Sequence, residues 1–475
     1  MTSALARRLG RRRPARSALA FTRRLIAPMV LGAILNPINS SIIAVSLVPI
    51  GAAFGAPPSH TMWLVSALYL ATSIGQPVVG RLVDNFGPRR LFLAGAALTG
   101  AAGLLGTVAP SLTVLVVARV ILGFGTCAGY PVAMHLIRGE SRRTGENNPA
   151  SVLAILAVSS QTISVIGPPL GGLLISLGGW RSTFAINVPL ALTSLVLGWR
   201  RLPRARTAHA RGRLRLDLAG ISLFAATLLS LLLFLVTPEA GRLWLLAVTG
   251  CSAACFTARE LRARDPFIDL RVLRGNLPLL LTYARTLSTA LISYTFLYGY
   301  TQWLEDSHGL SASRAGLILL PMSALAVVVS AWTGRYPQVR AKLLVGQSIQ
   351  AITCALLLLL HARSPVWLLL LLTVLLGVPQ GLNNLAVQNA VYFQADPERI
   401  GASAGLQRTF LYLGAIAASS ASGVFFGKTA DTTGLHHVGL FTLIVGTAGL
   451  AITVLDRSLA RVGRSPDDFR RSSEP

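Results

Sequence analysis

The chain has 475 residues, of which 53% are hydrophobic and 13% charged, and its formal net charge at pH 7 is +26. So few charged residues exclude a soluble protein of this length and favour one that crosses a membrane many times. The net charge alone would suit a nucleic-acid-binding protein, but no folded recognition module accompanies it, so we expect no nucleic-acid partner.

Apolar runs that are long enough to cross a bilayer as helices recur along the whole chain. Counting runs of about 17 to 25 residues predicts an all-α integral membrane protein with about fourteen spans. Span 8 is the shortest, so twelve spans with a hydrophobic insertion are the alternative. The predicted spans are Leu25–Ile50, Thr61–Leu82, Leu91–Val108, Leu112–Leu136, Ser151–Leu177, Thr183–Trp199, Leu218–Val236, Leu243–Phe256, Leu277–Leu304, Ala315–Thr333, Leu343–Leu360, Val366–Val391, Ala402–Phe426 and Val438–Leu455.

Basic residues gather in segments that share one side of the membrane if the spans alternate. They crowd the N-terminal tail, Arg200–Arg215 and Arg259–Arg274, whereas an opposite loop such as Gly51–His60 carries almost no charge. Cytoplasmic loops are enriched in lysine and arginine. We therefore expect both termini in the cytoplasm and the protein in the cytoplasmic membrane, where the basic segments can touch anionic lipids.

A charged turn follows the second predicted span. Its sequence is Gly80-Arg81-Leu82-Val83-Asp84-Asn85-Phe86-Gly87-Pro88-Arg89-Arg90. Gly80 would let two helices approach closely, Gly87 would permit a tight turn, and Asp84 could face a helix N-terminus or an arginine. The spacing resembles the loop between helices 2 and 3 of the major facilitator superfamily of secondary transporters. The resemblance implies that Asp84, Arg89 and Arg90 help to gate the cytoplasmic side.

Span 4 contains Arg119 well inside an apolar sequence. A buried arginine is costly and usually faces a partner or a water-filled cavity, although snorkelling to an interface is the alternative. The family resemblance implies a role in proton-linked transport, but Leu122 stands where many members have glutamine. A second cation, Arg285 in span 9, lies about two turns from the cytoplasmic end and is a candidate for substrate binding or for snorkelling.

Span 5 carries the sequence Gly167-Pro168-Pro169-Leu170-Gly171-Gly172. Proline bends a helix and glycine permits close helix packing, so an ordinary kinked span is one interpretation. In the superfamily, a Gly-Pro-x-x-Gly-Gly element at this place is typical of exporters that exchange substrate for protons. The following Trp180-Arg181-Ser182-Thr183-Phe184-Ala185-Ile186-Asn187-Val188-Pro189 also resembles those exporters. Together the two elements favour export. The resemblance implies that Gly167, Pro168, Gly171 and Gly172 help to couple substrate movement to proton movement.

Spans 1 to 6 and spans 9 to 14 would form two six-helix bundles. The predicted division is a cytoplasmic tail at 1–24, a first bundle at 25–199, a basic linker with two extra spans at 200–276, a second bundle at 277–455 and a cytoplasmic tail at 456–475. This organisation resembles the fourteen-span drug:proton antiporter family.

The titratable acid that this family usually carries in span 1 is absent. The corresponding stretch contains Asn36 and Asn39, whose amides do not titrate. The remaining acids near the membrane are Asp84 and the adjacent Glu305 and Asp306. This pair could share a proton with a raised pKa, or it could be exposed in a loop.

We expect the substrate cavity near the bilayer midplane, between the bundles. Gln380, Asn384 and Gln388 of span 12 repeat at i, i+4 and i+8, so they form one stripe. Such side chains could instead hydrogen-bond helices to one another. The other cavity candidates are Asn36, Asn39, Gln161 and Arg285, with Tyr294, Phe296 and Tyr298 as aromatic walls.

The sequence predicts a secondary active transporter that exports small amphipathic molecules, such as drugs, antibiotics or secondary metabolites, with protons as the coupling ion. An importer or facilitator of a nutrient or metabolite is the alternative. We expect no enzyme activity, metal or cofactor, because the histidines and four cysteines lack metal-ligand spacing and no nucleotide-binding motif occurs. Buried arginines without facing acids favour an anionic, zwitterionic or neutral substrate. The protein is expected to be a monomer.

Overall fold

The computed structural model describes residues 23–144, 150–203, 217–236, 240–263, 266–268, 270–273, 275–334, 336, 338–395 and 400–461. These residues form helices and turns, with no strand among them. Within them, eleven helical segments are long and apolar enough to cross a membrane. They coincide with predicted spans 1 to 6, 8, 10 and 12 to 14, so the chain is a multi-pass membrane protein.

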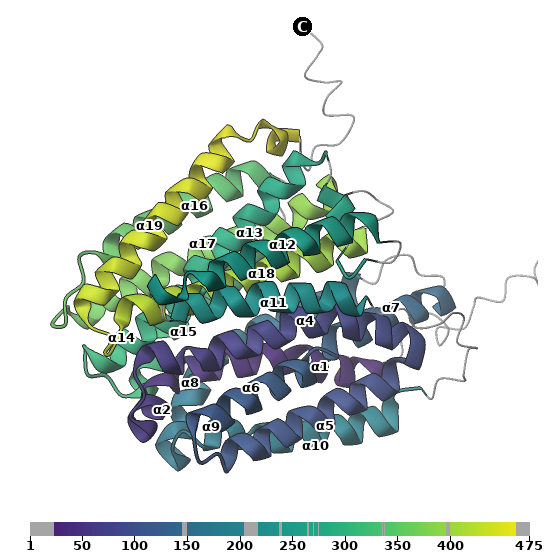
Figure 1. Cartoon of the computed structure of the whole chain (residues 1–475), viewed down its shortest axis with the longest axis horizontal. Helices are drawn as coiled ribbons and strands as arrows, with labels where there is room; N and C mark the ends of the chain where they lie inside the picture. Colours follow the sequence, from purple (N-terminus) through teal and green to yellow (C-terminus); the bar gives the residue numbers. More distant parts are fainter. Residues whose placement is uncertain are drawn as a thin grey trace, which may run out of the picture.

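A first set of helices, purple to blue in Figure 1, corresponds to spans 1 to 6, and we call it the first bundle. Within it α1 packs against α8, α5 packs against α10, and α6 lies between α4 and α5. Its elements are α1 (Arg23–Ile42), η1 (Ile43–Val45), α2 (Leu47–Phe54), α3 (Pro58–Thr61), α4 (Trp63–Phe86), α5 (Pro88–Thr107), α6 (Leu112–Thr126), α7 (Gly129–Thr144), α8 (Ala150–Gly178), α9 (Ser182–Ala185) and α10 (Asn187–Arg201).

The second bundle, green to yellow in Figure 1, packs α15 and α16 against α17, and α13 against α18. Its core contains fully buried aromatic side chains such as Phe296 and Trp303. The elements are α13 (Leu277–Thr295), η4 (Phe296–Tyr300), α14 (Thr301–Asp306), α15 (Ala312–Thr333), α16 (Val339–Leu357), α17 (Val366–Gln394), α18 (Ile400–Phe426), α19 (Thr432–Leu455) and η6 (Arg457–Arg461).

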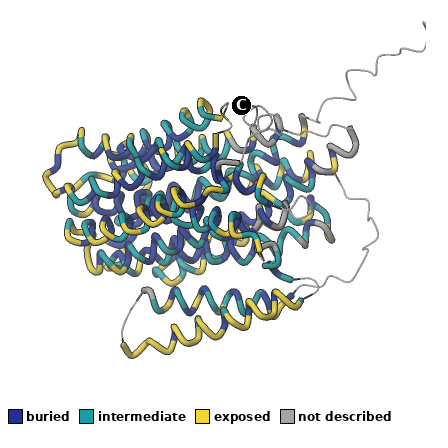
Figure 2. The backbone as a smooth tube through the Cα atoms, turned by 90° about the horizontal axis from the view of Figure 1, so that it is seen from above, coloured by how far each residue is buried: buried dark blue, intermediate teal, exposed yellow. Residues whose placement is uncertain are grey.

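Between the bundles in sequence lies a helical hairpin of α11 (Leu218–Val236) and α12 (Trp244–Arg262), joined by η2 (Ala240–Arg242). α11 contacts α4 of the first bundle and α18 of the second. The outer side of the hairpin is exposed, at the bottom of Figure 2, and carries apolar side chains such as Trp244. An apolar outer surface suits contact with lipid. Span 8 is longer than predicted, and the shorter apolar helix is that of span 7.

The predicted charged turn is mostly helical. α4 continues to Phe86, beyond the predicted end of span 2, and only Gly87, with φ of 86°, turns the chain. The close approach predicted at Gly80 is wrong in this conformation, because a Cβ there would meet no described atom within 4 Å. The side chain of Asp84 lies outside the described part of the structure.

Arg89 fastens the start of α5 to α10. Its Nη2 donates a hydrogen bond to the carbonyl of Trp199 at 2.9 Å, and its Cζ lies 4.6 Å from the Trp199 ring centroid. Arg90 is exposed at the same end of the molecule. We call the end where Arg89, Arg90 and Arg201 lie the basic end, and the end where Gly55 and Gly179 turn the chain the opposite end.

Candidate functional site

The two bundles are joined near the opposite end, in a contact that we call the seam. Five hydrogen bonds join described residues of the two bundles in this part of the helices. They are Ser66 Oγ with Ser419 Oγ (2.6 Å), Gln302 Nε2 to Thr61 Oγ1 (3.3 Å), Tyr298 Oη to the Ser40 carbonyl (3.0 Å), Tyr69 Oη with Tyr298 Oη (3.0 Å) and Ser313 Oγ to the Gly172 carbonyl (2.8 Å).

The glycine and proline motif of span 5 forms one side of the seam. A Cβ at Gly172 would lie 2.9 Å from the Ala312 carbonyl oxygen, and one at Gly316 would lie 2.5 Å from the Pro168 carbonyl oxygen. Gly171 instead faces the end of α1 and η1, where a Cβ would lie 3.0 Å from the Ile42 carbonyl oxygen and 2.8 Å from Val45. The motif therefore allows close contact on two sides of α8. One side packs within the first bundle and the other packs against α15 of the second, as small residues in a helix permit.

Four tyrosines from both bundles pack together beside the seam, and we call them the tyrosine cluster. Tyr69 of α4 lies 5.3 Å from Tyr294 and 5.7 Å from Tyr412, measured between ring centroids, and Tyr294 lies 5.7 Å from Tyr298. Tyr69 and Tyr298 are fully buried, whereas Tyr294 is partly accessible. The wider π-helical turn of η4 directly follows Tyr294 and Thr295 and contains Tyr298. Such turns are frequent at functional sites.

Arg119 lies on the seam side of the tyrosine cluster. Only 2% of its surface is exposed, which rules out snorkelling in this conformation. Its Nε donates to the Leu64 carbonyl at 2.8 Å and its Nη1 to the Asn39 carbonyl at 3.2 Å, so it ties α6 to α4 and α1. Its Nη2 has no partner in the described part of the chain. Arg119 is thus a buried cation held by backbone carbonyls.

Arg408 of α18, which was not among the predicted site residues, lies on the basic side of the cluster. Its Cζ is 5.1 Å from the ring centroid of Tyr130, which belongs to α7 of the first bundle. Tyr412, one helical turn further along α18, and Tyr294 of α13 are near enough to Arg408 to influence it electrostatically. The Arg408 side chain is exposed and Tyr130 is 39% exposed. Solvent therefore reaches these two side chains where they meet between the bundles, unlike the buried contacts at the seam. In the sequence, Arg408 could have been noticed as the one arginine inside predicted span 13.

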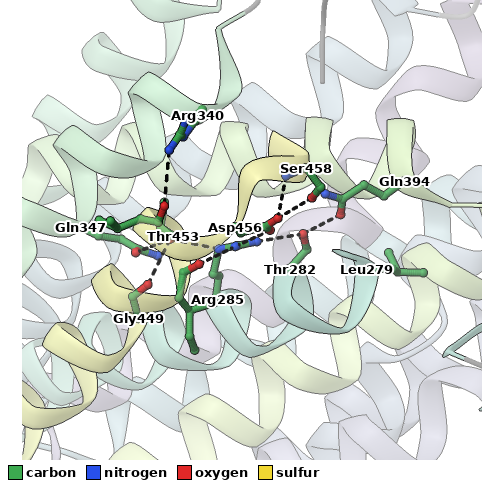
Figure 3. A network of polar contacts seen from close by, with 12 residues as sticks. Leu279, Thr282, Arg285, Arg340, Gln347, Gln394, Gly449, Thr453, Asp456 and Ser458 are labelled. Atoms are coloured by element: carbon green, nitrogen blue, oxygen red, sulfur yellow. Dashed lines mark hydrogen bonds and ion pairs between the residues drawn. The ribbon is translucent and has the colours of Figure 1, made fainter. Parts of the chain in front are cut away.

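Arg285, predicted to bind substrate, is buried in an ion pair in this conformation and faces no cavity that the structure describes. Its Nη2 pairs with Asp456 Oδ2 at 2.6 Å, and its Nε donates to Thr453 Oγ1 at 3.0 Å (Figure 3). Burial alone would raise the pKa of Asp456. Hydrogen bonds from Ser458 and Arg285 to its carboxylate have the larger effect, so the pKa is lower than usual. The arginine has a facing acid that we did not expect, and it ties α13 to the end of α19.

Several predicted cavity residues instead connect helices. Asn39 is 5% exposed and exchanges two hydrogen bonds, of 2.7 and 2.9 Å, with Asn187. Asn36 donates to Thr126 Oγ1 at 3.2 Å. Phe296, offered by the sequence as a cavity wall, is instead buried in the core of the second bundle in this conformation.

The polar stripe of span 12 shows graded exposure. Gln388 is exposed and donates to Asn384 Oδ1 at 3.0 Å, whereas Gln380 is only partly exposed. Gln161 on α8 is likewise partly exposed, and no hydrogen bond fixes its side chain among the described residues. These four side chains remain candidates for contact with substrate.

Glu305 and Asp306 end α14, just beyond predicted span 9, and the exposed-loop interpretation of this pair is wrong for Glu305. This glutamate is 9% exposed, and its Oε1 has no partner among the described residues. Burial, and then the neighbouring charge of Asp306, raise the pKa of Glu305 well above its usual range. Asp306 accepts a hydrogen bond from the Ala430 amide at 3.2 Å and lines a cavity of about 500 Å³ with Gln302 and Lys428.

Known proteins share both the sequence pattern and this fold. The chain is 32% identical to the uncharacterized MFS-type transporter YwoD of Bacillus subtilis, over 89% of this chain and 94% of the relative. It is 30% identical to the tetracenomycin C resistance and export protein of Streptomyces glaucescens, over 84% and 75%. A mutant of the peptide transporter POT has the same fold, with a TM-score of 0.66 and 15% identity over 92% of this chain and 95% of that one.

A family model described as Major Facilitator Superfamily matches residues 29–419, which run from α1 through the hairpin to Ser419 in α18. Multidrug resistance protein Stp of Mycobacterium tuberculosis is a further relative, 29% identical over 64% of this chain and 57% of that protein. The chain therefore belongs to the major facilitator superfamily of membrane transporters.

Proposed function

We propose that this transporter exports small amphipathic molecules across the cytoplasmic membrane by alternating access. The observation that carries the proposal is the asymmetry between the two ends. The bundles are joined at the seam, whereas Arg408 and Tyr130, between the bundles on the basic side, are exposed. If the basic end faces the cytoplasm, as the positive-inside rule implies, this conformation receives substrate from the cytoplasm.

Export rather than import is supported by two further observations. The Gly167–Gly172 motif, which resembles that of exporters, packs at the seam. Among the relatives are a tetracenomycin C resistance and export protein and multidrug resistance proteins. We also propose the fourteen-span topology with both termini in the cytoplasm. In this topology α13 and α16 cross the membrane in the second bundle although they carry buried polar residues.

Proton coupling is part of the proposal, with Glu305 as the proton carrier in place of the missing acid of span 1. Its carboxyl is buried, its Oε1 is unpartnered among the described residues, and its raised pKa brings proton uptake closer to neutral pH.

Few charged groups surround Glu305 on the elements that pack against its helix. α14 packs against α2, η1, η4 and α15. α2 and η1 carry no charged side chain. Asp306 and Lys428 line the adjacent cavity, η4 carries buried Tyr298 and Tyr300, and Arg314 of α15 is exposed.

The test is a screen of diverse amphipathic compounds in an efflux-deficient bacterial host. We expect expression of the chain to lower the accumulation of at least one compound. Inside-out vesicles should then take up that compound when their lumen is made acidic. Glu305→Gln should reduce this uptake and remove its response to the pH gradient, whereas Glu305→Asp should keep part of it. Increased accumulation in intact cells would establish import and contradict the proposal.

A further inference from the structure

Arg408 is a cation without a carboxylate partner among the described residues. The ion pairs described there join Arg259 to Asp217 and Arg285 to Asp456. The tyrosine cluster beside Arg408 is neutral, and the predicted spans contain no acid that faces it. A cation in a partly desolvated site attracts a counter-charge. Because no ion pair among the described residues neutralises Arg408, a bound anion could supply its counter-charge.

The groups around Arg408 are flat and aromatic, and they come from both bundles. Tyr130 lies across the gap, with its ring centroid 5.1 Å from the guanidinium carbon. Tyr412 is one helical turn further along α18, and Tyr294 projects from α13. Tyrosine rings stack on other rings, and their hydroxyl groups hydrogen-bond polar substituents. This combination suits a planar ligand with a negative group at one edge.

We propose that Arg408, Tyr130, Tyr294 and Tyr412 form a binding site for planar aromatic anions. The guanidinium would pair with a carboxylate, sulfonate or phenolate oxygen, for which its planar fork is well shaped, while the tyrosine rings stack on the aromatic system. This inference rests on the proposed function, because it takes the bound anion to be a transported substrate.

Arg119 does not provide an equivalent site. Arg119 is 2% exposed and its guanidinium donates to the carbonyls of Leu64 and Asn39, so a ligand between the bundles does not reach it in this conformation. The electropositive character that the sequence predicted for the cavity therefore comes from Arg408. Because Tyr130 belongs to the first bundle and Arg408 to the second, the ligand would contact both bundles at once. A ligand that bridges the moving halves can couple its binding to their rearrangement.

The test measures binding to the purified full chain in lipid nanodiscs, independently of transport. Two dyes with the same fused-ring framework serve as probes: fluorescein, which is anionic, and rhodamine 123, which is cationic. We expect fluorescence anisotropy to show tighter binding of fluorescein. Arg408→Gln should weaken fluorescein binding by about tenfold or more, the loss expected for one charge-assisted hydrogen bond.

Matched variants separate the site from general effects of charge and folding. Arg200→Gln removes one exposed arginine from the end of α10 and should leave fluorescein binding unchanged. Tyr130→Leu should weaken binding while Arg408 is kept. If Arg408→Gln does not fold, Arg408→Lys keeps the charge and should lose part of the affinity. Equal binding of both dyes, or fluorescein binding that is unaffected by the Arg408 and Tyr130 variants, would overturn the inference. Absence of efflux in cells would instead count against the proposed function, since binding is measured separately.

Discussion

Replacing Arg119 by alanine is expected to abolish transport while the protein still reaches the membrane. The change removes the donors to the Leu64 and Asn39 carbonyls and leaves a void between α1, α4 and α6. Each buried polar group that loses its partner costs about 1 to 3 kcal/mol. Arg119→Lys should retain only a small part of the activity, because one ammonium group cannot reproduce the guanidinium fork.

Transport of a compound identified in the screen, normalised to protein in the membrane, measures this effect. Arg200→Ala is the control, because Arg200 is exposed at the end of α10 and its removal should leave transport unchanged. Normal transport by Arg119→Ala at equal abundance would show that the buried arginine is unnecessary.

The second large effect is expected from Gly172→Leu. A side chain at this position would collide with the backbone of Ala312 and Ser313 in α15. Overpacking of this kind costs about 1 to 3 kcal/mol. If that cost falls only on the conformation with the closed seam, the conformational equilibrium shifts by roughly 5-fold to 150-fold. We expect transport to fall by about tenfold or more, because 1.4 kcal/mol is a factor of ten in an equilibrium constant.

Gly250→Leu provides the matched control. Gly250 lies on the exposed side of α12, where an added Cβ meets nothing within 4 Å. The same glycine-to-leucine change in another helix should therefore leave transport intact. Equal losses in both variants would mean that transport does not depend on close contact between α8 and α15.

Local sequence features predicted the positions of the helices well, because a span is determined by its own composition and length. The motif around Gly172 also predicted close helix packing, since small residues allow it with whichever helix is adjacent. Sequence could not identify α15 as the partner across the seam, because that contact depends on how the two bundles dock.

The errors in the candidate site have the same origin. Arg285 seemed to lack an acid because Asp456 lies 171 residues further along the chain, just beyond the last predicted span. Phe296 and Tyr298 seemed equivalent in the sequence, but helix geometry directs Phe296 into the core and Tyr298 to the seam. Arg408 was missed because its importance depends on Tyr130, which is contributed by the other bundle.

A reversible cross-link across the seam tests alternating access most directly. Ser66 Oγ of α4 and Ser419 Oγ of α18 are 2.6 Å apart, so Ser66→Cys with Ser419→Cys brings two thiols close enough for a disulfide. The experiment uses a background in which the four native cysteines are replaced, with each single cysteine variant as a control. We predict that mild oxidation stops transport by the double variant and that dithiothreitol restores it. Transport at the full rate by cross-linked protein would contradict the claim that the seam opens during each cycle.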